Sequence, residues 1–259
     1  MRLDDRAVMK IESEIWRQTV IEGGRELGVE VSADQVRALS RHAQELLRWN
    51  RVTNLTAITD PLEMAIKHYV DALAAAGWIG ASARILDAGS GGGFPGLPLK
   101  IVRSDLTVTL VDSVRKKVAF LNFVIGTLGL NGIHAVHDRL EDLARSPAYE
   151  RQFDVIVCRA FTSLEDFVRL CLPLLAPGGS LLALKGPQAD HDHEIGDLTD
   201  EERVVLAGRP FTVHIRRYTL PVLGDRRRLV RLTSGVEGGC RWLRRRGNCL
   251  TERTLRRKV

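Results

Sequence analysis

The 259-residue sequence has only four cysteines and no long run of apolar residues. The cysteines have neither the paired spacing of a zinc site nor the density of a disulfide scaffold; they are Cys158, Cys171, Cys240 and Cys249. No apolar run approaches the roughly 20 residues that cross a bilayer. The opening stretch MRLDDRAVMKIESEIW is too charged for a secretory signal peptide. These absences predict free thiols and a cytoplasmic protein with no metal site and no membrane segment.

Excess positive charge is confined to the C-terminal end of the chain. The formal net charge is +6, from 38 Lys and Arg against 32 Asp and Glu. Residues 240–259 hold eight of the basic residues and one of the acidic residues, so the rest of the chain carries 30 basic and 31 acidic residues. Such a tail can bind phosphates without sequence preference, or it can remain a flexible, solvated end. The composition leaves both alternatives open.

The first part of the chain has the pattern of amphipathic helices. One helix is expected over 32–50, where Ser32 and Gln35 have the spacing of a capping box and apolar residues recur on one face. A second is expected to begin at Asp60, with Pro61 at its first helical position. Together they predict a helical cap that precedes the main domain.

From residue 84 onward, short β-branched runs alternate with helical stretches. Strands are expected near 84–88, 107–112, 132–137, 153–158 and 180–185, which is the pattern of a mostly parallel sheet covered on both faces. The runs FTVHIRRYTL and RRLVRLT then predict a terminal antiparallel pair, for seven strands in all. Ligands of such sheets bind beyond the carboxyl ends of the strands.

A glycine-rich loop follows the first expected strand, in ILDAGSGGGFPGLPLKI. Glycine allows positive φ and close backbone approach, so this loop is expected to hold a ligand through its main chain. Gly91, Gly93 and Gly96 fit the G-x-G-x-x-G of dinucleotide sites, and Asp112 follows at the distance of a ribose-binding acid. The loop also fits D-x-G-x-G-x-G, a pattern of proteins that bind S-adenosylmethionine. A P-loop is excluded because no Lys-Ser or Lys-Thr follows the glycines.

Four blocks of the chain resemble one bacterial family. They are LLRWNRVTNLTAITDPLEMAIKHYVDAL, ILDAGSGGGFPGLPLKI, the pair HDRLEDL and VCRAFTSL, and ALKG with a downstream GDRRRLV. In this order, from about Thr19 to about Thr233, they are similar to the small-subunit ribosomal RNA methyltransferase G family, also called glucose-inhibited division protein B. The resemblance implies an α/β, class I Rossmann-like methyltransferase fold, with a mostly parallel seven-stranded sheet, helices on both faces and an N-terminal helical cap.

The resemblance also implies a reaction and a set of site residues. The family transfers a methyl group from S-adenosylmethionine to N7 of a guanine in 16S ribosomal RNA. The cofactor-binding residues carried over are Gly89, Phe94, Leu140, Glu141 and Arg159, to which the glycine pattern adds Gly91 and likeness of fold adds Asp112. The residues expected to position the substrate are Arg139, Lys185, Arg227 and His68. His68 and Asp71 can equally be contacts that hold the cap on the sheet. No general base is expected, because N7 already carries an in-plane lone pair.

The sequence suggests four segments and one main substrate. The segments are an N-terminal extension (1–18), a helical cap (19–80), a methyltransferase domain (81–235) and a basic tail (236–259). The expected partner is 16S ribosomal RNA within the small subunit or an assembly intermediate, and the protein is expected to be a monomer. Two other functions stay open: an NAD-dependent oxidoreductase, favoured only by the literal glycine match, and a non-catalytic RNA-binding assembly factor.

Overall fold

The computed structural model describes residues 10–11, 13–159, 163–186 and 200–234. Their helices are α1 (Glu14–Glu26), α2 (Ala33–Asn50), α3 (Pro61–Met64), η2 (Ala65–Val70), α4 (Asp71–Leu73), η3 (Ala76–Trp78), α5 (Gly96–Val102), α6 (Arg115–Thr127), α7 (Leu140–Leu143), α8 (Leu164–Cys171) and η4 (Leu172–Leu174). The strands are β1 (Arg84–Ala88), β2 (Thr107–Asp112), β3 (Ile133–His137), β4 (Phe153–Arg159), β5 (Leu175–Lys185), β6 (Glu201–Leu206), β7 (Arg209–Thr219) and β8 (Arg226–Ser234). Among these residues no helix is long and apolar enough to cross a membrane. The predicted basic tail (236–259) lies outside the described residues.

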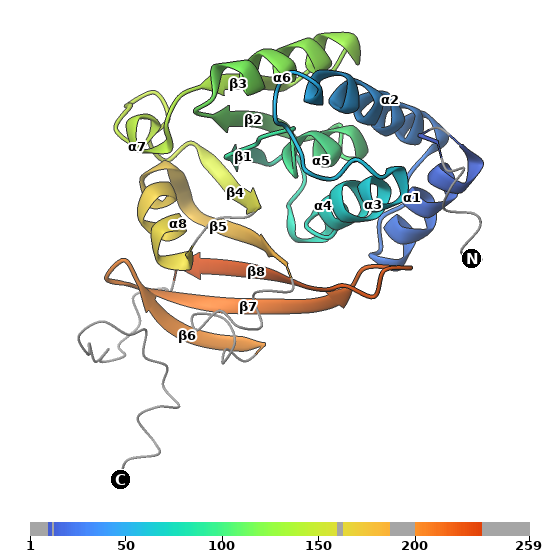
Figure 1. Ribbon diagram of the computed structural model, residues 1–259. Helices are drawn as coiled ribbons and strands as arrows, with labels where there is room; N and C mark the ends of the chain where they lie inside the picture. Colours follow the sequence, from blue (N-terminus) through green and yellow to red (C-terminus); the bar gives the residue numbers. More distant parts are fainter. Residues whose placement is uncertain (1–9, 12, 160–162, 187–199, 235–259) are drawn as a thin grey trace.

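The helices up to η3 pack together beside the sheet as the predicted cap (Figure 1). The capping box at the start of α2 is confirmed: Ser32 N donates to Gln35 Oε1 at 2.8 Å, and Gln35 N donates to Ser32 Oγ at 3.3 Å. The second predicted helix also begins as expected, with Asp60 as its N-cap and Pro61 in its first turn. Its middle, η2, is a π-helical segment that the apolar spacing did not predict.

Eight strands form one sheet in the order β3-β2-β1-β4-β5-β8-β7-β6 (Figure 1). The first five are parallel, and β8 runs antiparallel to both β5 and β7, so the parallel core and the terminal antiparallel pair are confirmed. The predicted count of seven was wrong because β6 pairs with β7 at the edge. The turn between them places Ala207 and Gly208 at φ of 47° and 74°. Asparagine or glycine is the usual residue at the first of these positions, so the hairpin had a weak sequence signal.

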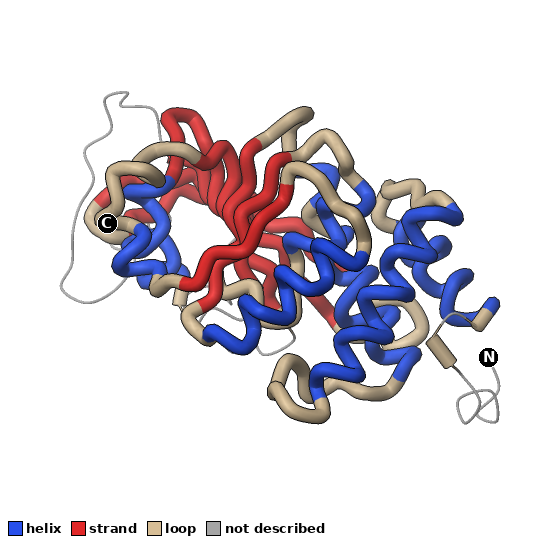
Figure 2. Tube along the Cα trace, turned by 90° about the horizontal axis from the view of Figure 1, so that it is seen from above, coloured by secondary structure: helices blue, strands red, loops and turns tan. Residues whose placement is uncertain are grey.

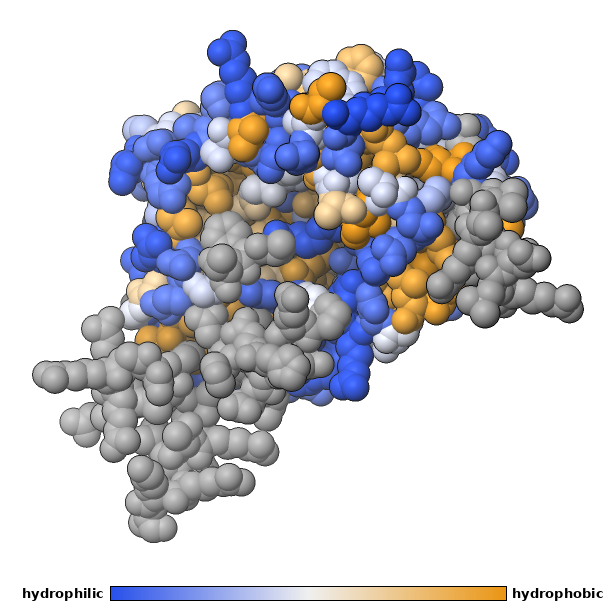
Figure 3. Space-filling model, viewed as in Figure 1, coloured by the Kyte–Doolittle hydropathy of each residue, from blue (hydrophilic) through white to orange (hydrophobic). Residues whose placement is uncertain are grey.

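Alternating side chains of the sheet enter two hydrophobic cores. In β1, Ile85 joins the core beneath the cap, α5 and α6, whereas Leu86 joins the core beneath α8. The view along the sheet shows helices on both of its faces (Figure 2). On the face seen in Figure 3, hydrophobic side chains gather on the side where the cap helices lie. The sheet therefore separates the cap from α8.

Two helical glycines offer a matched test of how tightly the cap is packed. A Cβ at Gly23 of α1 would lie 2.7 Å from a methyl of Val70, whereas a Cβ at Gly126 of α6 would meet nothing within 4 Å. Gly23→Ala should lower the free energy of unfolding by about 1–3 kcal/mol through overpacking. Gly126→Ala should raise it by about 0.5–1 kcal/mol through the lower conformational freedom of the unfolded chain. Urea unfolding measures both, and an equal gain from the two substitutions would contradict the close approach of α1 to η2.

Candidate functional site

The predicted site residues follow the carboxyl ends of the parallel strands. Parallel pairing sets Ala88 of β1 opposite Val111 of β2 and opposite Cys158 of β4, so these strands end at one edge of the sheet. The loops and strand ends gathered there carry Gly89, Gly91, Phe94, Asp112, Leu140, Glu141, Arg159 and Lys185. This edge is where open α/β sheets bind ligands.

The glycine loop is anchored to the sheet by its own backbone. Gly89 N and Ser90 N both donate to the carbonyl oxygen of Val111 at 2.9 Å. Gly89 and Gly91 have φ of 76° and 55°, a region that favours glycine. A Cβ built on either would meet no atom of the described residues within 4 Å, so this part of the chain leaves space beside both glycines. The backbone of the loop is therefore held to the sheet by hydrogen bonds, and Gly89 and Gly91 face away from the described side chains.

Asp112, at the end of β2, forms a hydrogen bond with the backbone of the glycine loop. Its carboxylate accepts hydrogen bonds from Gly91 N at 3.0 Å and from Val114 N at 2.8 Å, and Lys117 Nζ lies 3.8 Å away. Each carboxylate oxygen has a second lone pair, so a ligand hydroxyl can share the group with the two amides. The predicted ribose-binding acid is thus also a structural support of the loop.

Asp87 is a buried acid, the first residue of the D-x-G-x-G-x-G pattern, to which the sequence assigned no function. Its Oδ2 accepts a hydrogen bond from Gly96 N at 2.8 Å, while its Oδ1 has no partner among the described residues. Burial raises the pKa of Asp87 to about 7, against the opposing effects of the Gly96 amide and the positive charge of Arg159. A cationic group of a ligand beside Oδ1 would favour the ionised form.

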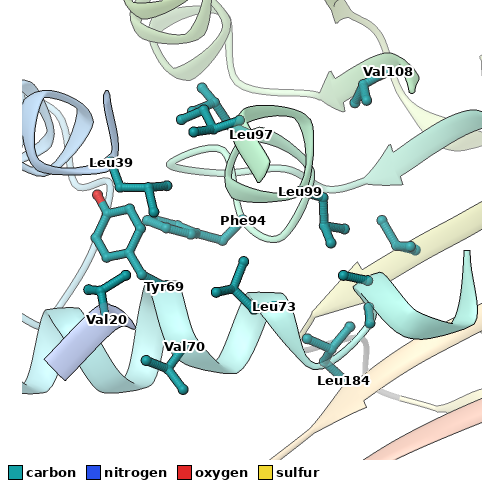
Figure 4. Close-up of a cluster of buried hydrophobic side chains, with 14 of the residues drawn as sticks. Val20, Leu39, Tyr69, Val70, Leu73, Phe94, Leu97, Leu99, Val108 and Leu184 are labelled. Carbon is teal, nitrogen blue, oxygen red and sulfur yellow. The ribbon is translucent and has the colours of Figure 1, made fainter. Parts of the chain in front are cut away.

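Phe94 joins the glycine loop to the cap through its ring. His68 stacks on it with ring centroids 4.5 Å apart, and the guanidinium carbon of Arg159 lies 4.9 Å from the ring centroid. Figure 4 shows Phe94 beside Tyr69 in a cluster of buried side chains. Arg159 also donates to the carbonyl oxygen of Lys67 at 3.1 Å. Phe94, His68 and Arg159 therefore form one contact, although they come from three separate segments of the chain.

His68 is neutral in this environment. Burial, followed by the positive charge of Arg159, lowers the pKa of His68 to about 3. Its Nε2 lies 2.7 Å from Thr56 Oγ1, and Nδ1 has no hydrogen-bond partner among the described residues. His68 can therefore offer a hydrogen bond to a neighbour, but it brings no positive charge to the site at neutral pH.

A buried ion pair connects the cap to the C-terminal hairpin. Asp71 Oδ1 accepts a hydrogen bond from the Tyr218 hydroxyl at 2.7 Å and lies 3.4 Å from Arg227 Nε. Arg227 also donates to Asp225 Oδ2 at 3.3 Å. Burial raises the pKa of Asp71, and Tyr218 and Arg227 oppose this shift. Asp71 thus contacts the hairpin through Arg227 and also through Tyr218, which the sequence had not singled out.

The basic residues expected to face the substrate differ in exposure. Arg139 is exposed next to α7, whereas Lys185 and Arg227 are both only 8% exposed. Near the last two is a cavity of about 270 Å³, and it is lined by Gly186, Arg217, Tyr218, Thr219, Arg226, Arg227 and Arg228. In α7, Leu140 is half-buried and Glu141 is exposed. A basic cavity thus lies close to the edge that carries the glycine loop, because β5 and β8 are neighbours.

Among the described residues, the cysteine nearest to the site, Cys158, lies in surroundings that disfavour the thiolate. Cys158 and Cys171 are free and buried; Cys240 and Cys249 lie outside the described residues. Burial raises the pKa of the Cys158 thiol well above its ordinary value. Cys158 also points into the core beneath α8. Its environment fits a packing role.

The pKa of Asp87 predicts a pH-dependent stability. Asp87 keeps its proton up to about pH 7 in the folded protein but loses it near 3.8 when unfolded. Its stabilising effect is thus complete below pH 3.8 and is lost as pH rises to about 7. The urea midpoint of Asp87→Asn, which resembles the protonated acid, should therefore rise relative to that of the unsubstituted protein as pH increases from about 4 to about 7, and the difference should level off above pH 7. A midpoint difference that does not change with pH would show that Asp87 is ionised throughout.

Comparison with known proteins gives one consistent match. A family model described as rRNA small subunit methyltransferase G matches residues 35–208. The Ribosomal RNA small subunit methyltransferase G of Geobacter sp. strain M21 is 41% identical over 214 residues, covering 83% of this chain and 95% of that protein. The protein of the same name from Geobacter sulfurreducens is 43% identical over 212 residues, covering 82% and 94%. The solved structure of TrmN from Thermus thermophilus has a TM-score of 0.46 and 20% identity, covering 72% of this chain and 52% of that chain. The residues matched by the family model include the cap from α2 onward and every strand from β1 to β6.

Proposed function

The chain belongs to the rRNA small subunit methyltransferase G family, and we propose that it transfers the methyl group of S-adenosylmethionine to N7 of a guanine in 16S ribosomal RNA. The observation that carries the proposal is the glycine loop at the carboxyl edge of the sheet, with open space beside Gly89 and Gly91. The loop, Asp112 and Arg159 lie within the segment that matches the family.

The residues present fit S-adenosylmethionine. The unpartnered, buried Oδ1 of Asp87 suits the cationic end of the amino-acid moiety, and Asp112 suits the ribose hydroxyls. Gly89 and Gly91 leave room for the ligand against the backbone. When bound, this cofactor supplies a methyl group on a sulfonium. Phe94, Leu140, Glu141 and Arg159 are proposed to complete the cofactor site.

The proposed reaction needs orientation more than acid–base chemistry. Guanine N7 has an in-plane lone pair and carries no proton that must be removed. The neutral His68 and the buried thiol of Cys158 accordingly need not exchange protons during the transfer. Holding two reactants in line can supply effective molarities of about 10⁵ M or more. The side chains of this site are therefore proposed to act by position and by exclusion of water.

The RNA is proposed to lie on the basic side of the site. Arg139 is exposed there, and the cavity lined by arginines adjoins the end of β5. These groups suit phosphates, because a guanidinium matches phosphate geometry. Positive charge moves onto the base in the reaction, so Lys185 and Arg227 are proposed to hold phosphates and not to touch N7. We also propose that the enzyme acts in the cytoplasm as a monomer, on the small subunit or an assembly intermediate.

The two other functions that the sequence left open can be separated from this one. An oxidoreductase would bind NADH through the same loop, so calorimetric titration with NADH and with S-adenosylhomocysteine distinguishes the two ligands. A non-catalytic assembly factor would bind RNA without turnover. Mass spectrometry of ribosomal RNA from cells with and without the protein tests the substrate, and the loss of one 7-methylguanosine is the expected result. Survival of every methylated guanine would overturn the assignment.

The absence of a general base predicts a flat pH profile. With saturating S-adenosylmethionine, the single-turnover rate of methyl transfer should be nearly independent of pH from about 6 to about 9, because no base must ionise. Saturation matters because Asp87 has a pKa of about 7 in the free protein and can make cofactor affinity pH-dependent.

Cys158→Ala should also keep this rate, since Cys158 is a packing residue. Lys185→Ala should lose activity mainly through weaker substrate positioning, seen as a higher KM for the RNA. Arg227→Ala should also raise this KM, and because it leaves Asp71 buried without its ion-pair partner, its loss of stability in urea is measured beside the KM. A steep acidic limb in the profile, or a folded, cofactor-binding Cys158→Ala enzyme without activity, would contradict the mechanism.

A further inference from the structure

His42 connects the cap directly to the glycine loop. Its Nε2 lies 2.9 Å from the carbonyl oxygen of Gly92, and its Nδ1 lies 3.1 Å from the Tyr69 hydroxyl. A carbonyl only accepts, so Nε2 carries the proton and Nδ1 accepts from Tyr69. Burial lowers the pKa of His42 to about 4, so the ring is neutral and keeps one tautomer at neutral pH. His42 Nε2 is thus the donor of the hydrogen bond to the Gly92 carbonyl oxygen.

The same face of α2 packs closely on Gly92. His42 and Leu46 are one helical turn apart, and a Cβ at Gly92 would lie 2.9 Å from Leu46 Cδ1. The His42 ring is fully buried and contacts the rings of Phe94 and Phe120, with centroids 5.2 Å and 5.9 Å away. Gly92 therefore has no room to move toward α2, and its carbonyl is directed at a single ring nitrogen.

The π-helical segment η2 supports this contact. Three consecutive residues of η2 touch the site: the Lys67 carbonyl accepts from Arg159, the His68 ring stacks on Phe94, and the Tyr69 hydroxyl donates to His42. Single π-helical turns are frequent at functional sites. Here the segment lets one helix of the cap hold three different parts of the site.

We propose that His42 is a positioning residue for cofactor binding, which holds the outer side of the glycine loop through the Gly92 carbonyl. This inference rests on the proposed function, because it takes the loop as the S-adenosylmethionine site. The inner side of the loop is fixed by the Val111 carbonyl and by Asp112. Gly92 has glycine on both sides, so without the bond from His42 this peptide can rotate and turn its neighbours away from the conformation that receives the ligand.

Three variants separate the hydrogen bond from packing. His42→Leu keeps an apolar side chain in the aromatic cluster but removes the partner of the Gly92 carbonyl and that of the Tyr69 hydroxyl. His42→Gln restores a donor near the position of Nε2. The control Val36→Ala removes buried methyl groups from the same helix, and Val36 lies more than a turn before His42. Urea unfolding of each protein records the loss of stability that is to be compared with binding.

The measurements are the Kd for S-adenosylhomocysteine by calorimetry and the KM and kcat for S-adenosylmethionine. His42→Leu should raise Kd and KM about tenfold, the effect of one buried unpaired carbonyl, with kcat changed less than about threefold. His42→Gln should recover most of the affinity, and Val36→Ala should bind like the unsubstituted protein.

Three outcomes would overturn the positioning role. They are unchanged binding by His42→Leu, equal weakening by Val36→Ala at a comparable loss of stability, and failure of a folded His42→Gln protein to recover affinity. Failure of the unsubstituted protein to bind S-adenosylhomocysteine at all would instead refute the proposed function. The two hypotheses therefore fail in different experiments.

Discussion

The site depends on a steric constraint: the glycine loop passes between the sheet and the cap with no space for side chains at its tightest points. A Cβ at Gly96 would lie 2.6 Å from Leu110 Cδ2 and 2.7 Å from Asp87 Oδ2. Because Gly96 has no side chain, its amide reaches the Asp87 carboxylate of β1, and Gly96 is the first residue of α5. On the other side, Gly92 allows α2 to approach. The loop is therefore closely packed at Gly92 and Gly96, whereas Gly89 and Gly91 have no described neighbour at the position of a Cβ.

Buried polar groups hold the cap against this edge. Removing charges from water is costly, and a buried pair rarely repays this cost in stability, so the Asp71–Arg227 contact is better understood as fixing a geometry. It ties α4 to β8, as Arg159 ties the end of β4 to η2. Both contacts are directional. The cap, the sheet and the terminal hairpin consequently meet at one place with a defined relative orientation.

Much of the fold could be predicted because its signals are local. The capping box at Ser32, the helix start at Asp60 and the five parallel strands each follow from neighbouring residues, and the structure confirms them. β6 was missed because its turn uses Ala207 at positive φ, where local preference favours other residues. The π-helical turn was missed because its six residues have no distinct apolar period, and its contacts with Arg159, Phe94 and His42 are tertiary.

The sequence by itself determined the family, the position of the glycine loop and the acids near the ends of the first two strands, Asp87 and Asp112, since these depend on residue types at short spacing. Only the tertiary structure decided the state of the site residues. The sequence predicts that Arg227 positions the substrate, and the tertiary structure adds that this side chain is buried against Asp71, which comes from the cap. Asp87 holds its proton to about pH 7 because elements distant in the sequence exclude water from it. Burial and partners arise from packing, which no short stretch of sequence encodes.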